Sequence, residues 1–128
     1  MKKPSIRKKH GPEYGIQNRI VTYLEARGWH IERVIGNAFQ SGLPDLYAGH
    51  KEFGQRWIEV KNASDYIFTR AQKLKFPVLD HYGIGIWVLV EATEEEYDKL
   101  FSTPNWKDYW KPSYGKINLD ELLDELNE

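Results

Sequence analysis

Two acidic residues and a lysine form the most informative pattern in this sequence. Asp45 follows a Gly-Leu-Pro triplet, and Glu59 and Lys61 belong to a segment in which apolar and other residues alternate. Successive side chains of a strand point to opposite faces. Glu59 and Lys61 would therefore share one face, while Ile58 and Val60 take the other. Because buried charges need a partner or a metal ion, this face indicates a functional site.

The two acids are fourteen positions apart in the sequence, but a hairpin would bring them together. Residues 43–48 and 55–62 are predicted strands joined by a turn at 49–54, and neighbouring strands lie ~4.8 Å apart. Two carboxylates at that separation can share one divalent cation. The chain has no cysteine, and oxygen ligands favour Mg²⁺, with Mn²⁺ as a substitute, over zinc.

Other groups complete this predicted site. The backbone carbonyl of Val60 could be a further metal ligand, and Glu13 could hold a metal-bound water. The ammonium of Lys61 could orient the attacking water or stabilise negative charge on a phosphate. Such a set suits metal-assisted hydrolysis of a phosphodiester bond. The alternative for Lys61 is a surface salt bridge with Glu59 or Glu32.

Glu13 would come from a helix predicted over residues 12–27, with proline at its first position and Gly28 as its stop signal. Its core-facing stripe consists of Ile16, Ile20, Tyr23 and Leu24. Glu13 begins this stripe and Gln17 shares its face, although an acid in the first turn also suits the helix dipole.

The remaining elements complete an α/β pattern. Residues 29–35 alternate as a strand does. Thr69 and Gln72 fit a capping box for a second helix whose apolar stripe is Ala71, Leu74 and Val78, with a kink or early end expected at Pro77. Residues 84–90 form an apolar run typical of a central strand. The order of helix, three strands, helix and strand predicts an α/β domain with a mixed sheet.

The C-terminal third is predicted to be helical. A short helix is expected over 94–101, and Asn118 would cap a last helix with Leu119, Leu122, Leu123 and Leu126 on one face. An aromatic cluster lies between them, and we favour packing on the fold over stacking on exposed bases. Its members are Trp106, Tyr109, Trp110 and Tyr114.

Asp45 after Pro44, with Glu59-x-Lys61 on the next strand, resembles the PD-(D/E)xK nuclease superfamily, and more closely its virus-type replication-repair (VRR-NUC) group. The resemblance covers about residues 11–91. The matching positions are Glu13, Gln17, Gly42, Pro44, Asp45, Glu59, Val60, Lys61, Gln72 and Gly83. Pro77 departs from the pattern and puts the orientation of Gln72 in question.

This resemblance implies a restriction-endonuclease-like core of αβββαβ order and metal-dependent cleavage of DNA. Asp45 and Glu59 would be the metal ligands and Lys61 a catalytic residue, with Glu13 and Gln72 assisting. For Gln72 a capping role alone is equally compatible with the sequence. The family also implies an intracellular, bacterial or phage-encoded protein that acts in DNA repair.

Composition fits one nuclease domain at residues 11–128, with a core at about 11–91, an extension at 92–128 and a flexible basic arm at 1–10. Residues 1–80 carry 14 Lys and Arg against 8 Asp and Glu, whereas 81–128 carry 4 against 11. A basic half suggests a polyanion as partner. The candidate DNA contacts are Lys8, Lys9, Arg33, Lys51, Arg70 and Lys73. His50 is expected only to be solvated.

The sequence thus predicts a Mg²⁺-dependent endodeoxyribonuclease selective for junctions, flaps or ends, since no base-reading motif is present. Alternatives are a non-catalytic DNA-binding module and a sequence-specific restriction-type endonuclease. Cleavage of a junction needs two active sites, so a homodimer is expected, with 92–128 as candidate interface. The absence of apolar runs of ~20 residues argues against a membrane span, and of an apolar signal core against export, so a cytoplasmic location is expected.

Overall fold

A computed structural model describes residues 12–35, 41–64 and 66–110. Several predictions lie outside these residues: the basic arm with Lys8 and Lys9, Tyr114, and the helix at 119–126. The described helices are α1 (Pro12–Glu25), α2 (Arg70–His81) and α3 (Glu94–Asp98), followed by 3₁₀ turns η2 (Lys99–Phe101) and η3 (Trp106–Tyr109). The strands are β1 (Trp29–Arg33), β2 (Leu46–His50), β3 (Gly54–Val60) and β4 (Ile86–Leu89).

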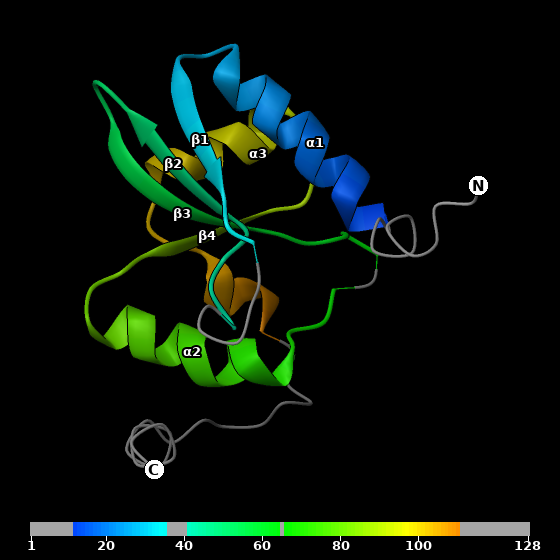
Figure 1. The fold of residues 1–128 in the computed structure, drawn as a ribbon, viewed down its shortest axis with the longest axis vertical. Coiled ribbons are helices and arrows are strands. Elements are labelled where there is room, and N and C mark those ends of the chain that lie inside the picture. The colour runs from blue at the N-terminus through cyan, green and yellow to red at the C-terminus, as the bar shows by residue number, and fades with distance from the viewer. Residues whose placement is uncertain (1–11, 36–40, 65, 111–128) are drawn as a thin grey trace, which may run out of the picture.

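The four strands form one mixed sheet in the order β1-β2-β3-β4. The first two pairings are antiparallel and the β3–β4 pairing is parallel. Helix α1 lies on one side of the sheet and α2 on the other (Figure 1). The predicted α/β class, the mixed sheet and the αβββαβ order are confirmed. None of the described helices combines the length and apolar character that crossing a bilayer requires.

Each face of the sheet has its own apolar core. On one face, Ile16, Ile20 and Leu24 of α1 pack against β2 and β3 as predicted, and Val21 is also buried there. Tyr23, the fourth residue of the predicted stripe, lies outside this cluster, and its hydroxyl binds Glu94. On the other face, Phe76 of α2 packs with residues of β4 and η3. Trp106 is buried there, and Tyr109 and Trp110 pack against it, so packing of these three aromatic residues is confirmed.

Strand β4 was expected to be central, and this is wrong. It is apolar because helices cover both of its faces, but it forms an edge of the described sheet. Side chains occupy the outer edge instead of another strand. The Asn105 side chain accepts from the Val88 N–H (2.6 Å) and donates to the Val88 carbonyl (3.2 Å), and Glu96 accepts from the Val90 N–H (2.9 Å). Pairing these groups protects the edge from another strand.

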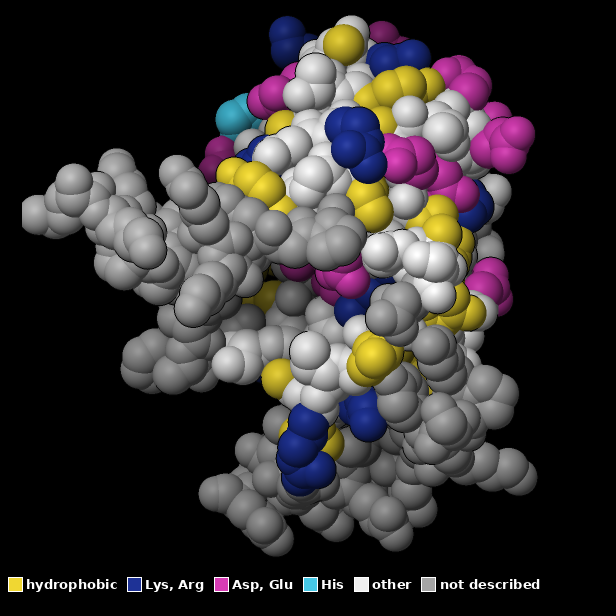
Figure 2. Space-filling model, turned by 90° about the vertical axis from the view of Figure 1, so that its right-hand side faces the viewer, with side chains coloured by type: hydrophobic (Ala, Val, Ile, Leu, Met, Phe, Trp, Pro, Cys, Tyr) yellow, Lys and Arg dark blue, Asp and Glu magenta, His cyan; other side chains and the backbone are white. Residues whose placement is uncertain are grey.

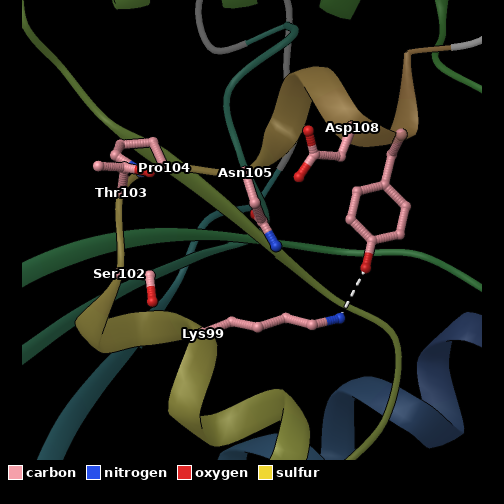
Figure 3. A pocket seen from close by; sticks show the side chains of 7 residues that line it. Lys99, Ser102, Thr103, Pro104, Asn105 and Asp108 are labelled. Atoms are coloured by element: carbon pink, nitrogen blue, oxygen red, sulfur yellow. Dashed lines mark hydrogen bonds between the residues drawn. The ribbon is translucent and has the colours of Figure 1, made fainter.

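A cavity of about 340 Å³ opens beside this edge. Figure 3 shows its lining side chains, including Asn105 and Lys99. The Lys99 ammonium donates to the Tyr109 hydroxyl (2.8 Å) and also binds Glu96. The polar side chains that line this cavity, Lys99 and Asn105, therefore hold η2, η3 and β4 together.

Helix α2 begins with the predicted capping box, since Thr69 and Gln72 exchange both hydrogen bonds. The predicted early end at Pro77 and the predicted apolar stripe are both wrong, whereas a kink at Pro77 stays a prediction. The helix continues past Pro77 to His81, and its buried residues are Gln72 and Phe76 instead of the stripe Ala71, Leu74 and Val78. Pro77 removes one backbone hydrogen bond and crowds the carbonyl of Lys73 one turn earlier, but the neighbouring Phe76 is fully buried in the core and holds this turn in place. The buried face is set by the polar partners of Gln72, which an apolar stripe cannot reveal.

Candidate active site

Asp45 and Glu59 face each other at the end of the β2–β3 hairpin. Leu46 is paired with Ile58, so the next position outward places Asp45 opposite Glu59 on the other face of the sheet. Strand β2 begins at Leu46, not at Leu43 as expected. Asp45 thus lies just before β2. Its side-chain Oδ2 accepts from the Val60 N–H (2.8 Å), and its backbone carbonyl accepts from the Val34 N–H (2.8 Å).

Pro44 leaves the Val60 carbonyl without a hydrogen-bond donor at residue 44. The same register, continued one further step, sets Pro44 opposite Val60. Proline has no N–H, so residue 44 cannot donate to the Val60 carbonyl as a ladder partner would. The N–H and C=O of one strand residue point to the same edge, and the Val60 N–H points to Asp45. The carbonyl therefore faces the same side as the acid.

Glu59, Lys61 and Gln72 form a buried polar cluster. The Lys61 ammonium donates to Glu59 Oε2 (3.1 Å), to Gln72 Oε1 (3.0 Å) and to the Ile67 carbonyl (2.8 Å). Gln72 Nε2 donates to Glu59 Oε2 (2.7 Å). An ammonium has three N–H groups, so all three donors of Lys61 are used. The alternative of a surface salt bridge is excluded, because both charged side chains are at most 4% exposed.

The pKa values of the two acids show the cost of placing them together. Burial and the charge of Asp45 raise the pKa of Glu59 to about 8, against the opposing effects of Lys61 and Gln72. Burial also raises the pKa of Asp45, against the Val60 N–H and Lys61, and the charge of Glu13 adds to the rise. At neutral pH the pair therefore keeps a proton where two separate carboxylates would be ionised.

The arrangement fits a divalent cation. Oε1 of Glu59 is buried and has no hydrogen-bond partner in the described part of the chain. Asp45 offers its second oxygen and Val60 its carbonyl, and this oxygen set suits Mg²⁺. A cation would neutralise the repulsion that now retains the proton. The described residues contain no group of three or more His, Cys, Asp or Glu side chains able to hold a metal, so the site would depend on two carboxylates.

Glu13 lies near this pair, since its charge affects the pKa of Asp45. It is half-buried in the first turn of α1. No described hydrogen bond joins it to the acids, so its role through a water molecule stays a prediction. Gln17, which shares its helix face, accepts from Arg33 (2.7 Å) and is therefore used to join α1 to β1.

The predicted DNA contacts are only partly brought together. Arg70 and Lys73 are on the first turns of α2, next to the cluster that contains Gln72. Arg33 is engaged with α1 through Gln17 and Asn18. Lys51 is in the β2–β3 turn, ~20 Å along the strand from Asp45. Figure 2 shows acidic and basic side chains meeting in the middle of one face, with further Lys and Arg side chains below.

His50 is a packed residue and not the solvated one that we expected. Its ring lies 5.1 Å from that of Trp29 and 4.4 Å from that of Phe53. Its Nδ1 accepts from the Glu52 N–H (3.0 Å), and Nε2 lies 3.1 Å from the Arg27 carbonyl. His50 therefore fixes the hairpin turn.

Sequence reasoning missed one polar partner of Lys61, and it named Gly42 without assigning it a structural role. The Ile67 carbonyl holds Lys61, and no side-chain pattern can point to a backbone carbonyl. Gly42 has a φ of +85°, and a Cβ there would lie 2.5 Å from the Ala71 carbonyl oxygen. Gly42 thus lets the loop before Asp45 pack on α2, which carries Gln72.

We expect Gly42→Ala to lower both stability and activity, because the loop must move away from α2. Gly83→Ala is the matched control, since Gly83 has a φ of +83° but nothing within 4 Å of its Cβ position. Positive φ alone costs about 1–2 kcal/mol, and Gly42→Ala should cost more. Thermal unfolding and cleavage assays measure the two effects. Equal loss of stability in both variants, with activity kept, would contradict this role.

Comparisons with known proteins give limited information. No protein-family model matches the chain, and no curated protein matches it. A similar solved structure is that of Hjc, a Holliday junction resolvase from the archaeal hyperthermophile Archaeoglobus fulgidus, with 20% identity and a TM-score of 0.45. The match covers 60% of this chain and 66% of that chain, slightly under two thirds of its length. The residues of the present chain, and not this likeness, are the basis for a functional assignment.

Proposed function

We propose that this chain is a Mg²⁺-dependent endonuclease that hydrolyses phosphodiester bonds in DNA, with a preference for branched or end-containing DNA. The observation that carries the proposal is the convergence of Asp45, Glu59 and Lys61. Two facing carboxylates retain a proton, one buried oxygen of Glu59 has no donor among the described residues, and a fixed ammonium lies 3.1 Å from Glu59. Membership of the VRR-NUC group is part of the proposal.

Asp45, Glu59 and the Val60 carbonyl would hold the cation, which supplies Lewis-acid charge and a more acidic bound water. Glu59 must first release its proton. Gln72 and Lys61 both donate to Oε2 of Glu59, which leaves Oε1 directed away from these donors. Gln72 thus positions the carboxylate as well as capping α2.

Lys61 supplies a fixed positive charge in this proposal. Its three donors are engaged, so direct donation to a phosphate oxygen requires the release of one bond. The bond to Glu59 at 3.1 Å is the longest of the three. Neutralisation of Glu59 by a cation would weaken this bond most. Lys61 would then stabilise charge that develops on the phosphate.

The test is a cleavage assay with Mg²⁺ on supercoiled, linear, flapped and four-way DNA. We expect Asp45→Asn to reduce cleavage about 10³-fold or more, because the amide still accepts from the Val60 N–H but lacks the charge. Asp80→Asn is the control. Asp80 is also half-buried and accepts a hydrogen bond from the Trp106 indole N–H, but it lies on another part of the fold. Full activity of Asp45→Asn would remove the residue from the mechanism.

Two other results would favour rival functions. Binding of branched DNA by the wild type without any nick would identify a non-catalytic DNA-binding module. Discrete fragments from a long natural DNA would identify a sequence-specific endonuclease. In either case the buried cluster would need another explanation.

A homodimer is also part of the proposal, because paired cuts in a junction need two active sites. Its candidate interface, residues 92–128, is described only as far as residue 110. A monomer at micromolar concentration in light scattering would count against this part.

A further inference from the structure

Tyr47 and Trp57 form an aromatic pair on the same sheet face as the two acids. They are directly paired across β2 and β3, and each is two residues along its strand from Asp45 or Glu59. Side chains two residues apart share a face and are about 7 Å apart. A nucleotide can span that distance. The pair is therefore in reach of the base next to a phosphate held at Asp45 and Glu59.

The two rings are held in place before any ligand arrives. Their centroids are 4.5 Å apart with an interplanar angle of 36°. The Tyr47 hydroxyl donates to the Gln55 side chain two residues before Trp57. Both rings are only half-buried. A rigid, partly open aromatic pair of this kind can stack on a base with little loss of side-chain entropy.

The indole N–H of Trp57 distinguishes it from tryptophans with a structural role. Those of Trp29, Trp87 and Trp106 donate to Tyr97, Ser102 and Asp80, respectively. Within the described ranges, that of Trp57 has no protein hydrogen-bond partner. Tryptophan N–H groups usually find a partner when buried. This donor is thus available to a ligand.

The surface beside the pair is open and suits a base better than a phosphate. A Cβ built on Gly49, the next position along β2 on this face, would meet nothing within 4 Å. Across β1, Tyr47 is paired with Glu32, whose carboxylate interacts with His30. A carboxylate repels phosphate. The positive charge of Lys61 lies in the other direction, beyond Glu59, where the phosphate would bind.

We propose that Tyr47 and Trp57 form a stacking site for the base of an unpaired nucleotide next to the cleaved phosphodiester bond. This inference rests on the proposed nuclease function and gives it a substrate class. A base inside an intact duplex is stacked on its neighbours and cannot occupy the site. A nucleotide displaced at a branch, a flap or a frayed end can do so. Base–aromatic stacking tolerates any base, so the preference concerns structure and not sequence.

The test uses splayed-arm DNAs that differ at one position. An abasic residue is scanned through the unpaired nucleotides at the branch, and each DNA is compared with its parent. Binding is measured by fluorescence anisotropy in EDTA, and cleavage is measured with Mg²⁺. At one position we expect the wild type to prefer the natural base by about fivefold to a hundredfold. In Trp57→Leu this preference should fall to about one, with the abasic DNA bound as before.

Trp87→Leu is the matched control, because Trp87 is another half-buried tryptophan, one strand away and on the opposite face of the sheet. It should affect both DNAs equally. If Trp57→Leu does not fold, Trp57→Phe keeps a smaller ring and must show a partial loss of discrimination. The inference would be overturned if Trp57→Leu weakened binding of the parent and abasic DNAs equally. It would also be overturned if the wild type bound every abasic DNA as tightly as its parent. Base-dependent binding without cleavage would support it and overturn the nuclease function instead.

Discussion

Replacing Glu59 by glutamine is expected to reduce Mg²⁺-dependent cleavage severely and, at the same time, to make the metal-free protein more stable at pH 8. The glutamine carbonyl can accept from Gln72 and Lys61 as Oε2 of Glu59 does. The new NH₂ group takes the place of Oε1 and can donate to Asp45. The variant thus satisfies the cluster without a cation. The loss of a metal ligand should reduce cleavage about 10³-fold or more.

The gain in stability depends on pH in a defined direction. The pKa of Glu59 is raised from its ordinary value of 4.5 to about 8 in the folded protein. Between these values the folded state holds a proton that the unfolded state has lost, so the free energy of unfolding falls as pH rises. The raised pKa of Asp45 acts in the same direction. Glu59→Gln removes the contribution of Glu59, so the variant should gain most at pH 8 and little at pH 4.

Thermal unfolding between pH 4 and pH 9, with and without Mg²⁺, measures this effect. Mg²⁺ should stabilise the wild type, more strongly as pH approaches 8, and should not stabilise the variant. Glu96→Gln is the matched control, because Glu96 is also buried but has N–H and ammonium partners on both oxygens. A Glu59→Gln protein less stable than the wild type at pH 8 would show that the cluster is built for the metal-free state.

The sequence was sufficient to predict the convergence of Asp45, Glu59 and Lys61, because strand alternation and a hairpin leave few other arrangements. It was also sufficient to predict the capping box at Thr69 and Gln72, since both partners are local. The position of β4 was not predictable in this way. An apolar run indicates that both faces of a strand are covered, but it does not show whether another strand lies beside its edge. In β4 the edge is occupied by the side chains of Asn105 and Glu96, which come later in the chain.

The face of α2 that contacts the sheet was mispredicted for a related reason. The apolar residues of that helix suggest one stripe, but polar bonds from Gln72 to Glu59 and Lys61 fix another. The third N–H of the Lys61 ammonium donates to the Ile67 carbonyl, which is a backbone group and leaves no side-chain pattern. Sequence patterns identify the chemically distinctive side chains, whereas the partners that hold them come from the packing of distant segments.

Removing the ammonium of Lys61 should separate activity from stability. In Lys61→Met, Gln72 Oε1 still accepts from the Thr69 N–H (3.1 Å), and Glu59 Oε2 still accepts from Gln72 (2.7 Å). Only the Ile67 carbonyl loses its donor among the described groups, so the stability loss should be about 1–3 kcal/mol. Cleavage should fall about a hundredfold to a thousandfold or more, because the fixed positive charge is lost.

The pH profile of the remaining activity distinguishes this role from a structural one. Lys61 opposes the rise in the pKa of Glu59, so without it the carboxylate keeps its proton to higher pH. The residual cleavage of Lys61→Met should therefore need a higher pH than that of the wild type. Lys99→Met is the control, because Lys99 is partly buried and, like Lys61, hydrogen-bonded, here to Glu96 and Tyr109. This variant should lose stability only. A Lys61→Met enzyme with more than about a tenth of wild-type activity and an unchanged pH profile would limit Lys61 to a packing role, since an electrostatic contribution of the expected size cannot be lost without both effects.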